Sequence, residues 1–286
     1  MILRPLLAAA AAAAVTASSL WVLPAAAQGV LERMAETGEI RLAVRRDAPP
    51  HSWMEGGAAQ GYSVDLCTQA AQRVAQAAGL SGIAFVYVPV DAAERFEAVA
   101  EGRADLLCGA ATVTLGRRAL VEFSLPTFVD GAGVMLRRGE ETDFGGLAGK
   151  RLGVLGGTTT ELALRGTLEG TGMPGEVTTV AGHDAGVAAL LDGEVDAYFA
   201  DQSILMFLAA GSGAADRLSV ADNTLTVERH ALALPKGDEA FRAALDAALS
   251  RMHREGAVAG AFRRAFPGAT PGRGMQALLL LGGLPD

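Results

Sequence analysis

Short β-type runs alternate with segments of helical periodicity along most of this 286-residue chain. The helical segments place their apolar residues three and four positions apart, whereas the runs between them are continuously apolar. Strands that alternate with helices of about 10–15 residues predict βαβ units and parallel sheets. In the first half of the chain, strands are expected at 40–44, 85–90 and 104–108, and helices at 63–78 and 92–101.

The alternation restarts in the second half of the chain. The stretch 101–110 (EGRADLLCGA) lines up with 192–201 (DGEVDAYFAD), so that Ala110 and Asp201 each follow a buried strand. Two similar α/β lobes are therefore predicted. Because open parallel sheets bind ligands at the carboxyl ends of their strands, two facing lobes would line a cleft from both sides. The expected strands here are 151–155, 177–180 and 197–200, and the expected helices are 161–169, 185–191 and 203–210.

Two extended segments are expected to join the lobes, 133–138 (GVMLRR) on the way out and 229–235 (RHALALP) on the return. C-terminal helices should pack on the first lobe, and the apolar segment 275–281, which is too short to span a bilayer, should cap it. The predicted lobes cover 28–134 plus 233–286 for the first and 135–232 for the second.

The first 27 residues form a distinct segment. Arg4 is its only charge, an apolar run follows at 6–23, and three alanines at 25–27 supply the small residues of a cleavage site. This pattern predicts a removable secretory signal peptide over 1–27, with an uncleaved membrane anchor as the alternative that the alanine-rich run makes less favourable. The mature protein is therefore expected in the periplasm, and its net charge of −8 before processing argues against nucleic acid as a partner.

Cys67 and Cys108 are the only two cysteines. In an exported chain they face an oxidising compartment, which favours a disulfide between them over the alternative of two buried free thiols.

The strand at 104–108 leads into two threonines and an arginine pair. Thr112 and Thr114 precede Arg117 and Arg118 in the run TVTLGRR. Arginine binds a carboxylate with two parallel hydrogen bonds and keeps its charge at any physiological pH. Arg117 is therefore a candidate anion ligand, with a surface salt bridge at a helix start as the alternative, and Arg118 is expected to be solvated.

The second lobe offers two further candidates. The run GGTTTE at 156–161 ends a strand and opens a helix, and Thr158 with Glu161 has the spacing of a capping box. The free N–H groups of such a helix start also bind anions, and the two interpretations are compatible. Asp201 is either a helix N-cap or a carboxylate that faces Arg117 across the cleft, an arrangement that suits a zwitterion. The four histidines lie far apart in sequence, and no metal-ligand spacing or nucleophile motif is found, so neither a metal nor a cofactor is predicted.

With these motifs assembled, the chain resembles the periplasmic solute-binding proteins for polar amino acids, which are components of ABC importers. The segment 61–66 (GYSVDL) is similar to a family signature that usually has an acid where Ser63 stands, and the TxTxxR run with the following FS.P and the segment 196–202 (DAYFADQ) also match. The resemblance implies a type II periplasmic-binding-protein fold, with two α/β lobes of mostly parallel sheets flanked by helices and joined by two crossover strands.

The resemblance also implies roles for individual residues. Arg117 would bind the ligand's α-carboxylate, and Asp201 its ammonium group. Thr112, Ala110 and the N–H groups of Thr158 and Thr159 would complete the carboxylate clamp, and Tyr62 would lie near the cleft mouth.

In the glutamate/aspartate-binding branch, an arginine after the first strand and a histidine of the second lobe meet the ligand's side-chain carboxylate. By motif spacing these fall on Arg45 and His183, for which a solvated loop charge and a helix cap are the alternatives. The turn at 50–53 (PHSW) resembles the family's P-F-S-aromatic turn, with His51 in place of phenylalanine.

The expected function is therefore capture of an amino acid, with a preference for glutamate or aspartate, by a monomer that delivers it to an ABC transporter permease without inserting into the membrane. An exported enzyme on the same fold, similar to cyclohexadienyl dehydratase and using Glu161 as an acid, is one alternative. The sensor input of a signalling system is another.

Overall fold

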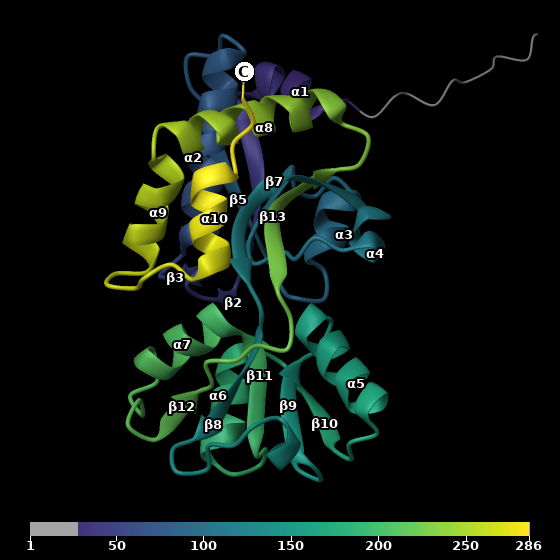
Figure 1. The fold of residues 1–286 in the computed structure, drawn as a ribbon. Coiled ribbons are helices and arrows are strands. Elements are labelled where there is room, and N and C mark those ends of the chain that lie inside the picture. The colour runs from purple at the N-terminus through teal and green to yellow at the C-terminus, as the bar shows by residue number, and fades with distance from the viewer. Residues whose placement is uncertain (1–27, 286) are drawn as a thin grey trace, which may run out of the picture.

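The computed structural model describes residues 28–285, and the predicted signal peptide lies outside this range. The described chain folds into two α/β lobes, one above the other in Figure 1, each built around a five-stranded sheet. This confirms the predicted two-lobe class. None of the described helices combines the length and the apolar character that crossing a membrane requires.

The first lobe contains the sheet β5-β1-β6-β13-β7. β1 pairs in parallel with β5 and β6, whereas β13 is antiparallel to both of its neighbours. Side chains alternate between the two faces of β1: Leu42 and Val44 enter a core with the long helices, and Ala43 enters a second core with α3. The strands of this sheet are β1 (Glu39–Arg45), β5 (Ala84–Val90), β6 (Leu106–Cys108), β7 (Val121–Asp130) and β13 (Glu228–Pro235).

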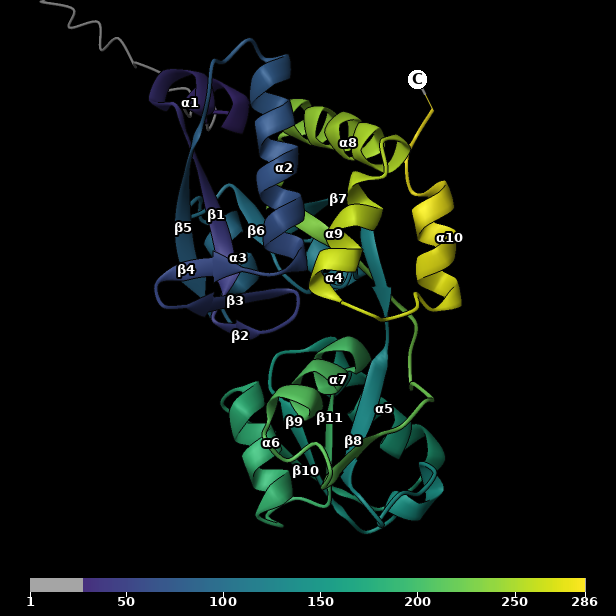
Figure 2. The same cartoon turned by 90° about the vertical axis from the view of Figure 1, so that its left-hand side faces the viewer.

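Helices from both ends of the chain cover this sheet. Figure 2 shows α2, α8, α9 and α10 gathered on one side of it. The predicted C-terminal cap is confirmed, because α10 packs on β7 and buries Met275 and Leu278. The helices of this lobe are α1 (Val30–Thr37), α2 (Tyr62–Ala77), α3 (Arg95–Ala100), α4 (Leu115–Arg118), α8 (Glu239–Arg254), α9 (Ala257–Ala265) and α10 (Arg273–Leu281), and a small three-stranded sheet consists of β2 (Asp47–Ala48), β3 (Ser52–Glu55) and β4 (Ala58–Gln60).

The second lobe contains the sheet β10-β9-β11-β8-β12 with helices on both faces. α5 contributes Leu164 and Leu168 to one core, and α6 and α7 contribute Leu190 and Leu205 to the core on the opposite face. Its elements are β8 (Ala132–Arg137), the 3₁₀ turn η1 (Gly145–Leu147), β9 (Arg151–Leu155), α5 (Thr159–Thr171), β10 (Glu176–Val180), α6 (His183–Leu191), β11 (Ala197–Asp201), α7 (Gln202–Gly211) and β12 (Leu218–Val220).

The internal echo seen in the sequence corresponds to equivalent structure. The parallel strands β5-β1-β6 of the first lobe have the same order and direction as β10-β9-β11 of the second lobe. The turn aspartates also match: Asp105 accepts hydrogen bonds from the Arg41 backbone N–H (2.9 Å) and guanidinium, and Asp196 accepts the same pair from Arg151 (2.9 Å for the backbone N–H). The carboxyl ends of β6 and β11 therefore occupy equivalent places.

The chain crosses between the sheets a few residues earlier than the sequence boundaries of 134 and 232 suggested. β7 ends at Asp130 in the first sheet and β8 begins at Ala132 in the second, so Gly131 alone separates them. On the return, all of β13 from Glu228 pairs within the first sheet. A Cβ on Gly131 would lie 2.1 Å from the Thr226 carbonyl oxygen, which shows how closely the two crossovers pass.

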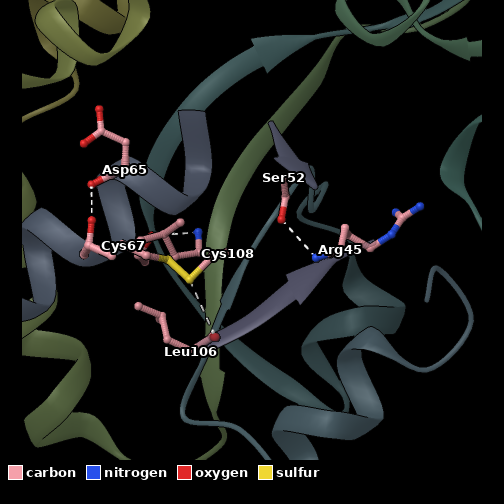
Figure 3. Close-up of a disulfide and its surroundings, with 9 residues drawn as sticks. Arg45, Ser52, Asp65, Cys67, Leu106 and Cys108 are labelled. Carbon is pink, nitrogen blue, oxygen red and sulfur yellow. Dashed lines mark hydrogen bonds between the residues drawn. A yellow bond between two sulfur atoms is a disulfide. The ribbon is translucent and has the colours of Figure 1, made fainter. Parts of the chain in front are cut away.

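A disulfide links α2 to the carboxyl end of β6, as expected from the cysteine count. Cys67 and Cys108 have Cα atoms 5.9 Å apart and are separated by 41 positions in sequence. Figure 3 shows the bridge beside the end of β1, where the Arg45 side chain points away from it. The bridge thus fixes α2 to the carboxyl end of β6, which Ala110 and Thr112 follow closely in sequence.

Candidate ligand-binding site

A pocket lies between the lobes, at the carboxyl ends of their parallel strands. Its cavity volume is only about 20 Å³, which is room for about one water molecule, so the lobes lie closely together over the groups that line it. Both lobes contribute to its walls, as predicted for a cleft between two α/β lobes. The lining residues are Arg45, Arg95, Ala110, Thr112 and Arg117 from the first lobe, and Leu155, Thr158, Thr159, Thr160, His183, Phe199, Ala200, Asp201 and Ile204 from the second.

Arg117 enters the pocket from α4. The Thr114 hydroxyl caps this helix by accepting the Arg117 backbone N–H (3.1 Å), and an Arg117 Nη1–H donates to the Thr112 carbonyl oxygen (2.8 Å). The guanidinium also lies 4.6 Å from the centre of the Phe96 ring. These contacts hold the charge at the pocket wall, whereas the side chain of neighbouring Arg118 is 51% exposed.

Arg95 is a second arginine of the pocket, and the sequence analysis missed it. Its residue is only 3% exposed, its guanidinium lies 4.6 Å from the Phe96 ring centre, and one N–H donates to the Ala92 carbonyl. Burial, followed by the charges of Arg117 and Arg45, drives the pKa of Arg95 well below its usual range. The Nε atom of Arg95 has no hydrogen-bond partner among the described residues. An anion in the pocket would reduce the repulsion among the arginines and would accept a hydrogen bond from Arg95 Nε.

Arg45 lies where β1 ends, as predicted, and it connects the two lobes through Asp47. An Arg45 Nη2–H donates to Asp47 Oδ1 (2.6 Å), while Asp47 Oδ2 accepts the backbone N–H of His183 at 3.4 Å. Arg45 is buried, and its Nε has no hydrogen-bond partner among the described residues. Arg45 is therefore a buried arginine that lines the pocket, with its guanidinium fixed by Asp47, and not a solvated loop arginine.

His183 faces the pocket from the start of α6. Its Nδ1 lies 2.9 Å from the Tyr198 hydroxyl, a contact that fixes the ring orientation. Burial lowers the pKa of His183 to about 4, and the charge of Arg45 acts in the same direction. The imidazole is consequently neutral at physiological pH.

Hydroxyl groups from both lobes converge on a buried glutamate. Glu228 Oε2 accepts hydrogen bonds from the hydroxyls of Thr112 and Thr159, the latter at 2.7 Å, and Glu228 Oε1 accepts from Thr226 (2.8 Å). The two threonine hydroxyls are themselves 3.2 Å apart. Glu228 is 6% exposed and begins the return strand β13, so it joins the first lobe, the second lobe and the hinge.

The helix start at the second-lobe wall is capped by a threonine that lines the pocket. The Thr158 hydroxyl accepts the Glu161 backbone N–H (3.2 Å), which confirms half of the predicted capping box. Glu161 instead reaches Gly157, whose N–H it accepts at 2.9 Å, and it pairs with Arg165. Glu161 is therefore directed into its own helix and is not among the residues that line the pocket.

Asp201 ends β11 and precedes α7, but it forms no side-chain cap with that helix. Its Oδ1 accepts a hydrogen bond from the Thr160 hydroxyl (3.3 Å), and its Oδ2 lies 3.5 Å from His230 Nε2. Burial and the nearby Asp130 and Glu228 carboxylates raise the pKa of Asp201 well above its usual range. An ammonium group in the pocket would compensate this carboxyl.

The structure does not bring Tyr62 to this pocket. Tyr62 is fully buried in the first lobe, where its hydroxyl donates to the Thr127 carbonyl oxygen (2.6 Å) and its ring packs edge-on against Phe128. Its position at the start of α2 directs the side chain into the aromatic core, so the expected place at the cleft mouth is wrong. The other predicted site residues all line the interlobe pocket, and Arg95 and Glu228 are the additions.

The arrangement defines a binding protein with two lobes and a charged cleft between them. The chain belongs to the bacterial extracellular solute-binding proteins, family 3, whose family model matches residues 40–268. This confirms the family expected from the sequence motifs.

Individual relatives agree with this assignment. An "L-glutamate/L-aspartate-binding protein" of Pseudomonas aeruginosa is 27% identical over 251 residues, covering 87% of this chain and 83% of that protein. The "Glutamate/aspartate import solute-binding protein" of Escherichia coli is 24% identical and covers 88% and 84%. Among solved structures, the ancestral amino acid-binding protein AncCDT-1, a precursor of cyclohexadienyl dehydratase, has a TM-score of 0.72 and 22% identity, covering 82% of this chain and 99% of that one. This last similarity establishes the fold alone.

Proposed function

We propose that this protein binds an acidic amino acid, glutamate or aspartate, between its lobes in the periplasm and delivers it to the permease of an ABC transporter. The observation that carries the proposal is the convergence of Arg45, Arg95 and Arg117 on one small pocket. A neutral amino acid presents one carboxylate to three guanidinium groups. An acidic amino acid presents two.

The α-amino-acid group is assigned to the side of the pocket where Arg117 and Asp201 face each other. Arg117 would bind the α-carboxylate, aided by the Thr112 hydroxyl and by the N–H groups of Thr158 and Thr159 at the start of α5. Asp201, whose pKa is raised when no cation compensates it, would accept the ammonium group. Ala110 also lines the pocket.

The side-chain carboxylate is assigned to Arg45, Arg95 and His183. Both arginines are buried, and each has a guanidinium nitrogen without a hydrogen-bond partner among the described residues. A charge-assisted hydrogen bond contributes about 1.5–3 kcal/mol, so two such arginines give a carboxylate a large advantage over an amide. The names of the two relatives, which both include glutamate and aspartate, support the same ligand class.

Calorimetric titration with glutamate, aspartate, glutamine, asparagine and arginine tests the proposal. We expect the two acids to bind at least about a hundredfold more tightly than the matching amides, from about 3 kcal/mol of lost charge-assisted bonding. Equal affinity for glutamate and glutamine, or tighter binding of arginine, would show that the arginines do not select a second carboxylate.

A further inference from the structure

Behind the pocket, the hinge contains a buried cluster of two histidines and an aspartate. His51 lies in the turn before β3, Asp130 ends the crossover strand β7, and His230 lies on the return strand β13. Potential ligand atoms of these three residues all lie within 4.8 Å of one another. His51 and His230 are at most 1% exposed, and the Asp130 side chain is 5% exposed.

The imidazoles of this cluster lack most of the hydrogen bonds that buried ring nitrogens normally make. Neither ring nitrogen of His230 has a hydrogen-bond partner among the described residues, and neither has His51 Nδ1. Buried polar groups normally have a hydrogen-bond partner, so these unpaired nitrogens indicate a missing ligand. The ring contacts with Phe128 account for packing but satisfy no nitrogen lone pair.

Three carboxyl groups lie around the same point. Asp130, Asp201 and Glu228 all lie at the hinge, and Asp201 and Glu228 form a second group with His230 within 4.8 Å. Among the described residues, no lysine or arginine forms an ion pair with any of these three carboxylates.

We propose that His51, Asp130 and His230 form a binding site for a divalent first-row transition-metal ion, with Zn²⁺ as the reference ion. Two imidazoles and one carboxylate are a donor set that suits Zn²⁺ and its neighbours, whereas Ca²⁺ and Mg²⁺ prefer oxygen ligands alone. The ion would bind one nitrogen of each imidazole, so it would give a partner to one of the two unpaired nitrogens of His230, and it would offset the carboxylates of the hinge.

The surrounding contacts are those of an oriented ligand set. Asp130 Oδ1 accepts the backbone N–H groups of Gly131 (2.9 Å) and Ser203 (3.4 Å), which fixes the carboxylate while its Oδ2 faces His51 Nε2 at 3.8 Å. Metal–ligand bonds of about 2.0–2.2 Å require ligand atoms somewhat closer than this, so binding entails a small contraction of the cluster.

The second lobe covers the cluster through Ser203. Ser203 lies in the first turn of α7, in the second lobe. Its hydroxyl donates to Asp130 and lies 2.8 Å from His51 Nε2. Separation of the lobes would remove this cover, so the ion would enter in the open state and would then join three segments that meet at the hinge.

The test is Zn²⁺ titration of the tag-free chain, stripped with a chelator, by calorimetry and by metal analysis after gel filtration, in the absence of amino acids. We expect one Zn²⁺ per chain and no binding of Ca²⁺. Phenylalanine preserves a ring that packs against Phe128, so His51→Phe and His230→Phe should stay folded while weakening Zn²⁺ binding at least about tenfold. His253→Gln, a change to a histidine on α8 outside the cluster, should bind Zn²⁺ like the wild type.

Two results would overturn the proposal. One is wild-type protein without stoichiometric Zn²⁺ binding, which would leave the histidines a purely aromatic packing role. The other is Zn²⁺ binding that His253→Gln lowers as much as the two cluster variants, or that the cluster variants leave unchanged. Because no amino acid is present, these outcomes are independent of whether glutamate is the ligand.

Discussion

Replacing Arg117 by alanine is expected to weaken binding of the best amino-acid ligand by roughly two to four powers of ten. Arg117 lines the pocket, and its guanidinium is held by the Thr112 carbonyl oxygen at 2.8 Å and by the Phe96 ring. A ligand carboxylate would complete a desolvated pair with this charge. Removing one partner of such a pair costs about 3–5 kcal/mol, and each 1.4 kcal/mol or so corresponds to tenfold in affinity.

Arg118 provides the matched control, because it is the next residue of the same helix. Its side chain is 51% exposed, and its closest described ionic partner is Glu122, 4.0 Å away. Exposed ion pairs contribute about 0–1 kcal/mol, so Arg118→Ala should change the affinity by less than about fivefold. Both variants should melt as cooperatively as the wild type, since both arginines lie on the short α4 and outside the two cores of the first lobe.

Titration calorimetry of the three proteins with glutamate decides the point. Comparable losses from the two substitutions would mean that the effect is a general change in surface charge. An Arg117→Ala variant with unchanged affinity would mean that the ligand's α-carboxylate binds elsewhere. The proposed role of Thr112 in binding that carboxylate would then also be wrong.

Three further predictions follow from the same geometry. Arg95→Gln should weaken glutamate by about ten- to a hundredfold and glutamine far less, as calorimetry with both ligands would show, and equal losses would argue against a side-chain carboxylate at Arg95. Replacing Cys67 and Cys108 by alanine should lower the free energy of unfolding by roughly 4 kcal/mol, because the bridge closes a loop spanning a sequence separation of 41. Denaturant titration would check this, and the m-value should rise because the unfolded chain without the bridge exposes more surface. Because burial lowers the pKa of His183 from 6.5 to about 4, the folded state binds fewer protons than the unfolded state in this interval, and stability is lost as the pH falls. Between pH 7 and pH 4 the wild type should therefore lose about 3 kcal/mol more than His183→Asn, and parallel pH profiles would contradict the shift.

The sequence was sufficient to predict the lobes and most of the pocket wall. The alternation of strands and helices fixes the direction in which each strand ends, and residues that directly follow strands, such as Arg45, Ala110 and Asp201, must then lie at one edge of a sheet. The disulfide followed from the predicted export and from a count of two cysteines. These inferences depend on local pattern and topology, which a single sequence contains.

Arg95 and Glu228 could not be found in this way. Arg95 stands in the run AERFEAVA, which has the composition of an ordinary solvated helix. One signal was available: a cation in the first turn of a helix is electrostatically unfavourable, so its presence there indicates another role. Glu228 acquires its role from Thr112, Thr159 and Thr226, which come from three separate parts of the chain. Contacts of this kind are set by lobe packing.

Tyr62 shows the opposite failure. The sequence places it next to a helix start, but the direction of its side chain depends on which face of the helix meets the core. Phe128 and Phe266 provide an aromatic environment on that face, and the Thr127 carbonyl oxygen satisfies the hydroxyl. Burial of a large aromatic ring outweighs exposure at a cleft.

The charges of the pocket also imply that closure depends on ligand. All three pocket arginines belong to the first lobe, and the second lobe covers them with threonine hydroxyls and His183. With the lobes apart, water screens the guanidinium groups. With the lobes together, burial and mutual repulsion oppose the charge of Arg95, which is why its pKa is depressed. An anionic ligand removes this penalty, so the closed state should be favoured only when glutamate is bound.

Trp53 offers a direct measurement of this coupling. It is the only tryptophan beyond residue 27, and its ring lies 5.9 Å from the ring of Phe207 on α7 of the other lobe. Glutamate should therefore change the emission of Trp53 and decrease the radius of gyration measured by X-ray scattering, and Phe207→Ala should remove most of the fluorescence change but not the compaction. Arg95→Gln lowers the repulsion, so its ligand-free form should be more compact than the ligand-free wild type. Identical scattering of the wild type with and without glutamate would show that repulsion among the arginines does not hold the lobes apart.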